Sequence, residues 1–160
     1  MTLDELNALP PGEAERTLLQ CSGSRRWARQ MASGRPFATR DALFQAADRI
    51  WWTLDPDDWH EAFAAHPRIG ERRGTGWSRQ EQSGAYSAAE TTQAELATVN
   101  EAYEARFGYI FIVCATGRSG DEMLALARRR LQNDAASELR AAATEQAAIA
   151  RLRLAKLVDA

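Results

Sequence analysis

The sequence predicts an all-α protein, a single-domain bundle of several short helices and two or three longer ones. Two observations favour this fold class. Apolar residues recur at helical spacing in most segments, and capping residues, prolines and glycines separate those segments. Only the apolar run 109–115 resembles a strand, and no second strand candidate is present to pair with it. At 160 residues the chain is long enough to bury a substantial core, and we expect residues 1–160 to form one domain.

The N-terminal third predicts four helices. Three short ones are expected from Thr2 to Asn7, from Glu13 to Cys21 and from Ser24 to Ser33. Prolines or glycines follow each of them, and Ser24 is a typical N-cap. A longer helix is expected from Thr39 to Leu54, because its apolar residues share one face.

The next helix opens at Asp55, with Pro56 at its first position and acidic residues in its first turn. We expect it to end at or just before His66, because Pro67 disfavours the α conformation of the preceding residue. The imidazole of His66 then lies at a helix C-terminus, where the helix dipole favours its protonated form.

The helical pattern resumes at Ser78, with the carboxylate of Glu81 in the first turn. Two interpretations are open. Ser78 and Glu81 fit a capping box, with Ser78 as N-cap. Alternatively, His66 and Glu81 form an acid–base pair across a helix–loop–helix corner. Spacing alone does not choose between a structural and a chemical role for either residue.

A flexible basic loop is expected between these two segments. It contains glycines 70, 74 and 76 together with Arg72 and Arg73. The loop lacks the Gly-Lys-Ser/Thr ending of a phosphate-binding loop, so nucleotide binding is not expected there.

The longest amphipathic pattern runs from Ser87 to Phe107, and Gly108 ends it. Its apolar stripe consists of Leu96, Val99, Tyr103 and Phe107. Residues 109–115 are expected to be a buried extended or short helical segment. Another helix begins at Ser119 or Asp121, is interrupted at Asn133, and resumes to the end of the chain.

The composition is that of an ordinary soluble globular protein, with 45% hydrophobic and 26% charged residues. A net charge of −2, with arginines interspersed among acids, favours neither nucleic acid nor an anionic membrane as partner. No membrane-spanning run or signal peptide is evident, so we expect a cytoplasmic protein.

Few residues are suited to metals or covalent cofactors. The chain has two cysteines and two histidines, without zinc-site spacing, and its only lysine is Lys156. A carboxylate-rich metal site is not excluded by counting. We expect chemistry performed by side chains and backbone, with no metal and no cofactor.

Three blocks of sequence carry a family resemblance. They are His66-Pro67-Arg68-Ile69-Gly70 with Ser78-x-x-Glu81-Gln82-x-Gly84, then Asn100-x-x-Tyr103-x-x-x-Phe107-Gly108-Tyr109-Ile110-Phe111-Ile112-Val113-Cys114-Ala115, then Ile149-Ala150-Arg151-Leu152-Arg153-Leu154. In order and spacing they resemble the 2-oxo-4-hydroxy-4-carboxy-5-ureidoimidazoline (OHCU) decarboxylases of the ureide pathway. The resemblance covers nearly the whole chain, although the loop 70–77 is shorter than in many members.

The resemblance implies a lyase of urate and purine catabolism that needs no cofactor. Such an enzyme decarboxylates OHCU to (S)-allantoin, and the family assigns the proton donor to the position of His66. Glu81, if ionised, would orient His66 or accept a hydrogen bond from the substrate hydroxyl. A homodimer is expected from the family alone.

The resemblance also implies a set of substrate-binding residues. They are Pro67, Ser78, Arg79, Gln80, Glu81, Gln82, Phe111, Ile112, Val113, Cys114, Ala115 and Arg153. Residues 111–115 would bind the heterocycle mainly through backbone groups, and their alternative role is core packing. The guanidinium of Arg153 would donate two hydrogen bonds to a carboxylate or ureido oxygen. The alternative is that Arg153 is an ordinary helix arginine exposed to solvent.

Two other classes of function compete with this interpretation. One is a small helical binding or regulatory module without catalysis. The other is a helical hydrolase that uses Glu81 as its base. Only a decarboxylase accelerates the formation of (S)-allantoin over the spontaneous route that gives racemic product.

Overall fold

The computed structural model describes residues 1–71 and 76–159, and these residues form ten α-helices and no strand. The predicted all-α class is confirmed. The helices make up two compact units: unit 1 comprises residues 1–62 and 146–160, and unit 2 comprises residues 63–145. Both boundaries between the units fall within helices, α5 and α10.

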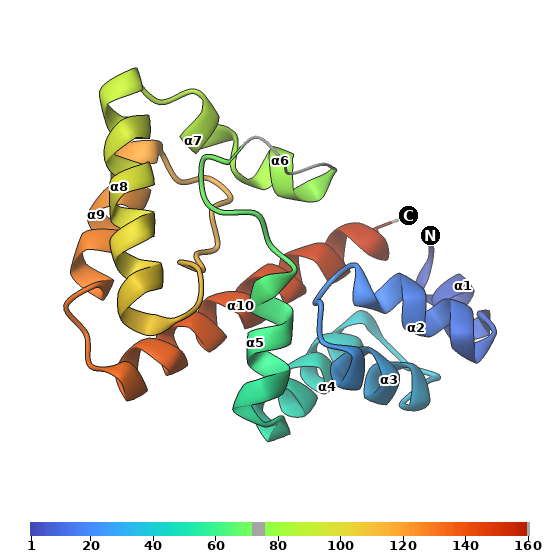
Figure 1. Cartoon of the computed structure of the whole chain (residues 1–160). Coiled ribbons are helices and arrows are strands. Elements are labelled where there is room, and N and C mark those ends of the chain that lie inside the picture. The colour runs from blue at the N-terminus through green and yellow to red at the C-terminus, as the bar shows by residue number, and fades with distance from the viewer. Residues whose placement is uncertain (72–75, 160) are drawn as a thin grey trace. The chain divides into compact units, whose positions relative to one another are not determined.

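Unit 1 contains the N-terminal helices and the last part of the C-terminal helix (Figure 1). They are α1 (Leu3–Ala8), α2 (Pro11–Leu19), α3 (Arg25–Ser33), α4 (Arg40–Thr53), most of α5 (Pro56–Ala64) and the end of α10 (Ala135–Leu157). The second helix begins at Pro11, before the predicted Glu13, because proline is well accommodated in a first helical turn.

Side chains cap three of these helices where the sequence indicated a helix start. Thr2 and Glu5 form a reciprocal capping box on α1. The hydroxyl of Ser24 accepts a hydrogen bond from the Trp27 amide at 3.2 Å, and that of Thr39 accepts one from the Ala42 amide at 3.1 Å. Each cap satisfies an amide that has no partner inside its helix.

The core of unit 1 is built around two tryptophans, Trp27 on α3 and Trp51 on α4, each at most 2% exposed. The indole N–H of Trp27 donates to the Ala47 carbonyl at 3.1 Å, so its polar edge is satisfied inside the core. Leu154 on α10 is fully buried in this unit.

Unit 2 contains two short helices and two long ones, followed by the first part of α10. They are α6 (Trp77–Glu81), α7 (Ser83–Tyr86), α8 (Glu90–Phe107) and α9 (Gly120–Arg130). The helix expected from Ser87 starts three residues later, and α7 precedes it as a separate element. It ends at Gly108, whose φ of +81° is the left-handed conformation that glycine adopts without strain.

The predicted N-cap of α6, Ser78, is wrong by two residues, and the capping box is therefore absent. The helix begins at Trp77, the N-cap position is Gly76, and no side chain caps the helix. Gly76 has a φ of +56°, and its carbonyl accepts from the Gln80 amide at 3.3 Å. Ser78 therefore lies inside the helix and Glu81 is its last residue. The rest of the predicted glycine-rich loop, residues 72–75, lies outside the described residues.

The stripe predicted on α8 lies in the core of unit 2. Leu96, Val99 and Tyr103 are buried, and Phe107 packs against the same cluster. Residues 109–115 have no regular secondary structure, and four of them are at most 4% exposed: Phe111, Ile112, Val113 and Ala115. The Tyr103 ring contacts the rings of Phe107 and Phe111, with centroid distances of 4.8 and 5.5 Å.

A buried carboxylate lies beside these rings. Glu138 of α10 is fully buried, and its Oε1 accepts from the Tyr103 hydroxyl at 2.5 Å and from Arg130 Nε at 2.7 Å. Its Oε2 accepts from the side-chain amide of Asn133 at 3.0 Å. Burial above all, and then the hydrogen bond to Glu138, raise the pKa of Tyr103 far above its usual range.

Helix α7 packs closely against the turn before α9. A Cβ added to Gly84 would overlap the backbone carbonyl oxygen of Arg118, and one added to Gly120 would lie 2.6 Å from the Ala88 Cβ. The glycine of the Ser78-to-Gly84 motif is therefore a point of close approach between backbones.

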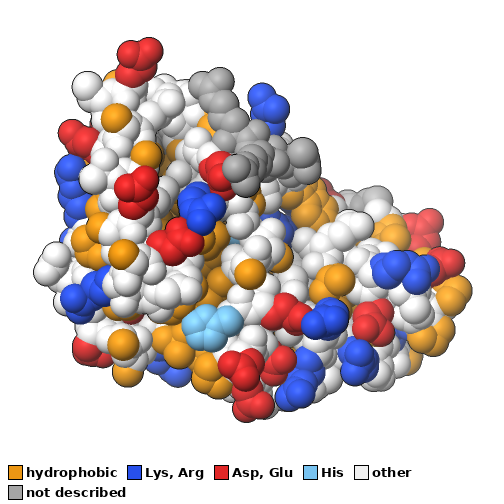
Figure 2. Space-filling model, in the orientation of Figure 1, with side chains coloured by type: hydrophobic (Ala, Val, Ile, Leu, Met, Phe, Trp, Pro, Cys, Tyr) orange, Lys and Arg blue, Asp and Glu red, His pale blue; other side chains and the backbone are white. Residues whose placement is uncertain are grey.

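Charged side chains of both signs are interspersed on the face shown in Figure 2, as the sequence predicted. Among the described residues, no helix combines the length and the apolar character that a membrane span requires.

Replacing Tyr103 with Phe tests the buried carboxylate. The ring contacts remain, but Glu138 loses one donor, so we expect the free energy of unfolding to fall by about 1.5–3 kcal/mol at neutral pH. A tyrosine in the unfolded chain ionises near pH 10, whereas Tyr103 keeps its proton in the folded protein. Its stabilising contribution is therefore complete below about pH 10 and declines as the pH rises further.

Chemical unfolding of both proteins between pH 7 and 11 measures the two effects. Tyr86→Phe is the control, because the Tyr86 hydroxyl donates at 2.8 Å to a neutral backbone carbonyl, that of Glu71. Equal alkaline slopes for the wild type and Tyr103→Phe would contradict the assignment.

Replacing Gly84 with Ala tests the close approach of α7. Because the added methyl overlaps backbone atoms, we expect a loss of about 1–3 kcal/mol of stability, measured by thermal unfolding. Gly12→Ala is the matched control, since a Cβ there meets only the end of the Arg16 side chain at 3.6 Å. The close approach is refuted if both variants unfold at the wild-type temperature.

Candidate active site

The site begins where α5 ends, at Ala64, two residues before His66. The His66 amide donates to the Phe63 carbonyl at 3.2 Å, so the chain makes one further turn before Pro67. His66 and Pro67 are both half-buried. The predicted helix-terminal position of His66 is confirmed, and it places the imidazole at the negative end of the helix dipole.

The loop from His66 to Glu71 is anchored by α8. Arg68 donates from Nε and NH2 to the two carboxylate oxygens of Glu104, at 2.9 and 2.8 Å, and this pairing raises the pKa of the guanidinium. The side-chain amide of the buried Asn100 donates to the Ile69 carbonyl at 2.9 Å. Ile69 itself is part of the apolar core. Two side chains, four residues apart on α8, thus hold this loop by its backbone and by its arginine.

The short helices also hold the same loop. The Gly70 amide donates to the side-chain oxygen of Gln82 at 3.1 Å, and the Tyr86 hydroxyl donates to the Glu71 carbonyl at 2.8 Å. Gly70 has a φ of +83°, a conformation for which glycine is suited. The two parts of the first motif block, His66–Gly70 and Ser78–Gly84, are therefore joined directly by the bond from Gly70 to Gln82.

Glu81 is buried, with 8% of its surface exposed, at the end of α6. Its charge is felt by the Cys114 thiol. Burial is the main reason that the pKa of this thiol is raised, and the carboxylates of Glu145 and Glu81 raise it further. Glu81 therefore lies close enough to the segment 111–115 for electrostatic interaction. A carboxylate that is buried and does not cap its helix is consistent with a role in a site.

The segment 111–115 has both of its expected features. Its side chains are buried, apart from the half-buried Cys114, so core packing accounts for them. Its backbone is neither helical nor paired in a sheet. Arg118 donates to the last two carbonyls, from its amide to Ala115 at 3.0 Å and from Nε to Cys114 at 3.1 Å.

Arg153 lies on α10 in unit 1 and is only 8% exposed. Its NH1 donates to the Gln20 carbonyl at 3.2 Å. The alternative of a solvated helix arginine is therefore wrong.

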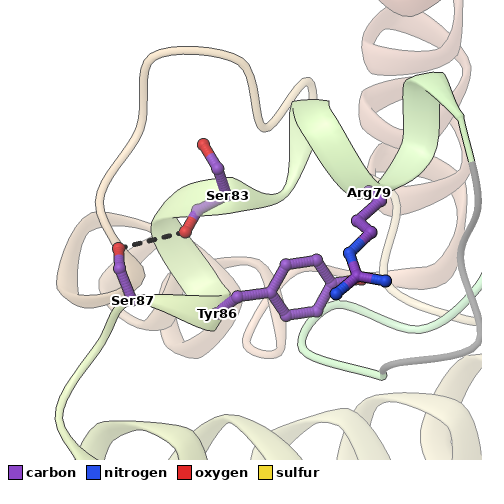
Figure 3. A pocket seen from close by; sticks show the side chains of 4 residues that line it. All are labelled: Arg79, Ser83, Tyr86 and Ser87. Atoms are coloured by element: carbon purple, nitrogen blue, oxygen red, sulfur yellow. Dashed lines mark hydrogen bonds between the residues drawn. The ribbon is translucent and has the colours of Figure 1, made fainter.

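The remaining predicted residues lie along α6. Ser78 is half-buried, whereas Arg79 and Gln80 are exposed. Arg79 lines a cavity of about 400 Å³ together with Ser83, Tyr86 and Ser87 (Figure 3). The Ser87 hydroxyl donates to the Ser83 carbonyl at 3.0 Å on its rim.

A second cavity, of about 490 Å³, lies over the loop 68–71 and α8. Its described lining includes Arg68, Asn100 and Glu104, the residues that anchor the loop. The structure thus brings the loop, α6 and the segment 111–115 together within unit 2 and places Arg153 in unit 1.

Sequence reasoning missed the side chains that support the site. Glu104 and Arg130 were not singled out, and Asn100 was named only as the first residue of a motif block, although each makes a hydrogen bond that holds a backbone or loop in place. A usable signal was present for Asn100, because it occupies a polar position directly beside the apolar stripe of α8.

Among the residues that the structure describes, no three His, Cys, Asp or Glu side chains are grouped so as to hold a metal ion. The expectation of chemistry without a cofactor stays a prediction.

Comparison with known proteins agrees with this arrangement. The family model described as OHCU decarboxylase matches residues 7–155. The uric acid degradation bifunctional protein TTL of Arabidopsis thaliana is 40% identical over 146 residues, which are 86% of this chain and 45% of that protein. This chain therefore spans about half the length of that relative. An OHCU decarboxylase of Haloferax volcanii is 32% identical over 134 residues, covering 81% of this chain and 80% of that enzyme.

Solved structures resemble it as well. A crystal structure of an OHCU decarboxylase in the presence of (S)-allantoin superposes with a TM-score of 0.81 and 39% identity, covering 89% of this chain and 96% of the other. An (S)-allantoin synthase structure, 20% identical with a TM-score of 0.75 over 99% of this chain and 55% of the other, shares the fold. The family match, the Haloferax relative and the motif loop built around His66 lead to one conclusion: this chain belongs to the OHCU decarboxylase family.

Proposed function

We propose that this protein catalyses the decarboxylation of OHCU to (S)-allantoin in urate degradation, with His66 as proton donor. The observation that carries the proposal is the anchoring of the His66 loop. Hydrogen bonds from Asn100 and Tyr86, and one to Gln82, fix its backbone. A loop restrained in this way holds an imidazole in a defined place, which proton transfer requires.

The reaction breaks the bond between the ring carbon and the carboxylate. Carbon dioxide leaves, and the electron pair is delocalised into the ring system. The carbanion-like centre then takes a proton from the imidazolium of His66 on one face, and His66 regains its proton from solvent. Because the helix dipole favours the protonated ring, His66 is suited to this role.

Glu81 and the backbone of 111–115 complete the proposed site in unit 2. The buried carboxylate of Glu81 orients His66 or accepts a hydrogen bond from the substrate hydroxyl. Among the described residues of unit 2, the amides of Ile112 and Val113 donate to no protein acceptor, so they are available to substrate oxygens. The guanidinium of Arg153 binds a carboxylate or ureido oxygen.

Three further features belong to this proposal. The family match spans both units, which supports one catalytic domain made of the two together. We expect the enzyme to act as a homodimer in the cytoplasm. We also expect it to work without metal or organic cofactor.

The test is stereochemical. Freshly generated OHCU is mixed with the protein, and allantoin is followed by circular dichroism and chiral chromatography. A decarboxylase accelerates product formation and gives an excess of the (S) enantiomer. A binding module or a hydrolase leaves the spontaneous rate and the racemic product unchanged, and that result would refute the proposal.

His66→Ala should retain the fold and lose most of the acceleration, because a positioned acid contributes about 10²–10⁴-fold. His60→Ala is the natural control, since His60 is the only other histidine and is exposed on α5. The measurement is kcat for both variants beside their melting temperatures. More than about a tenth of the wild-type rate in His66→Ala would exclude it as the donor.

Glu81→Gln separates charge from shape. Gln fills the same volume and keeps hydrogen-bonding capacity but does not ionise. If the carboxylate assists protonation, we expect kcat to fall at least about tenfold while the melting temperature changes little. Glu90→Gln, at an exposed acid in the first turn of α8, is the control. Wild-type turnover in Glu81→Gln would show that His66 works without this charge.

A further inference from the structure

The segment 111–115 is held in place by one buried arginine that the family motifs do not include. Arg130 is the last residue of α9, and its side chain is 10% exposed. Its NH1 donates to the backbone carbonyl of Ile112. The guanidinium carbon lies 4.6 Å from the centroid of the Phe111 ring. Arg130 thus contacts this segment through both its backbone and a side chain.

The guanidinium is itself held in a fixed orientation. Its Nε donates to Glu138 Oε1 at 2.7 Å, and its NH2 lies 2.6 Å from the same oxygen. The Tyr103 hydroxyl and the Asn133 amide also donate to this carboxylate, so the charge of Glu138 is surrounded by donors. The guanidinium is planar, and its Nε and NH2 both face Glu138. Its third nitrogen, NH1, is therefore fixed in one direction, toward the Ile112 carbonyl.

Fixing the Ile112 carbonyl also fixes the amide that follows it. The Arg35–Pro36 bond is the only cis peptide among the described residues, so the Ile112–Val113 peptide is trans and planar. The Val113 N–H therefore points opposite to the Ile112 carbonyl, away from Arg130. Within the described part of unit 2, this N–H has no protein acceptor.

The next peptide but one is held in the same way. Arg118 Nε donates to the Cys114 carbonyl at 3.1 Å, which directs the Ala115 N–H away from Arg118. The backbone of Arg118 also lies close to Gly84, where an added Cβ would overlap the Arg118 carbonyl oxygen. Two arginines from outside the segment therefore hold the carbonyls of Ile112 and Cys114. Among the described residues, the amides that follow these carbonyls, those of Val113 and Ala115, donate to no protein acceptor.

We propose that Arg130 is a positioning residue for decarboxylation: by holding the Ile112 carbonyl, it presents the Val113 N–H to an oxygen of the substrate. The inference rests on the proposed function, because it takes the segment 111–115 to be part of the substrate site. Arg130 touches no substrate atom in this scheme. A buried ion pair at this place provides orientation, which an apolar pair of similar volume does not.

The variant that tests it is Arg130→Lys, with Arg129→Lys as control on the same helical turn, where the side chain is exposed. A lysine bonded to Glu138 lacks the second arm that reaches Ile112. We expect KM for OHCU to rise about tenfold or more, the range of one hydrogen bond to a charged group, with a smaller change in kcat. Arg129→Lys should keep the wild-type KM. Assays are run well below the melting temperature of each variant.

A spectroscopic readout separates orientation from general loosening. In two-dimensional ¹H–¹⁵N spectra of the wild type, adding (S)-allantoin should shift the Val113 amide resonance. In Arg130→Lys that shift should be lost, whereas the side-chain amide of Gln82 should respond as before. A purely structural role would move both signals together or neither.

If Arg130→Lys does not fold, the double variant Arg130→Met/Glu138→Gln replaces it, because it leaves no uncompensated buried charge. It also lacks the donor to Ile112, so the same rise in KM and the same loss of the Val113 shift are expected. A folded variant with wild-type KM and an unchanged Val113 response would overturn the role of Arg130 alone. If the wild type gives no acceleration of (S)-allantoin formation, the proposed function falls and this inference falls with it.

Discussion

The burial of one carboxylate constrains most of unit 2. Glu138 has no exposed surface, and a charge in that position is stable only when donors surround it. Those donors come from α8 through Tyr103, from the end of α9 through Arg130, and from the turn before α10 through Asn133. Removing one partner of such a pair typically costs about 3–5 kcal/mol. The two long helices and α10 must therefore meet at this point, and the segment 111–115 is held beside it.

The proposed site is built from irregular backbone. Such backbone keeps a defined path only when the helices around it are rigid. The loop 66–71 and the segment 111–115 belong to no helix or sheet, so their backbone groups need partners from elsewhere. Asn100, Gln82 and Tyr86 supply them for the loop, and Arg118 and Arg130 for the segment. Side chains on the helices, and on residues next to helix ends, thus determine the path of both irregular segments, which carry the proposed catalytic and binding groups.

Local signals in the sequence were reliable where the interaction is local. Thr2, Ser24, Thr39 and Ser119 cap helices because a side-chain oxygen reaches an amide three residues away. The same logic failed at Ser78, whose spacing to Glu81 has the form of a capping box. There Gly76 takes a positive φ and the helix begins at the next residue, so Ser78 already lies inside it. A glycine's conformation depends on the chain around it and leaves no mark in the local pattern.

The sequence by itself determined the all-α class, the stripe on α8, the end of α5 before His66 and the unpaired nature of 109–115, because each depends on residues close together in the chain. Only the tertiary structure decided which polar groups are buried. The pairing of Arg130 with Glu138, the burial of Arg153 beside Gln20, and the approach of Gly84 to Arg118 join residues from different elements. A residue's burial is set by what packs over it, and that packing is settled only when distant segments meet.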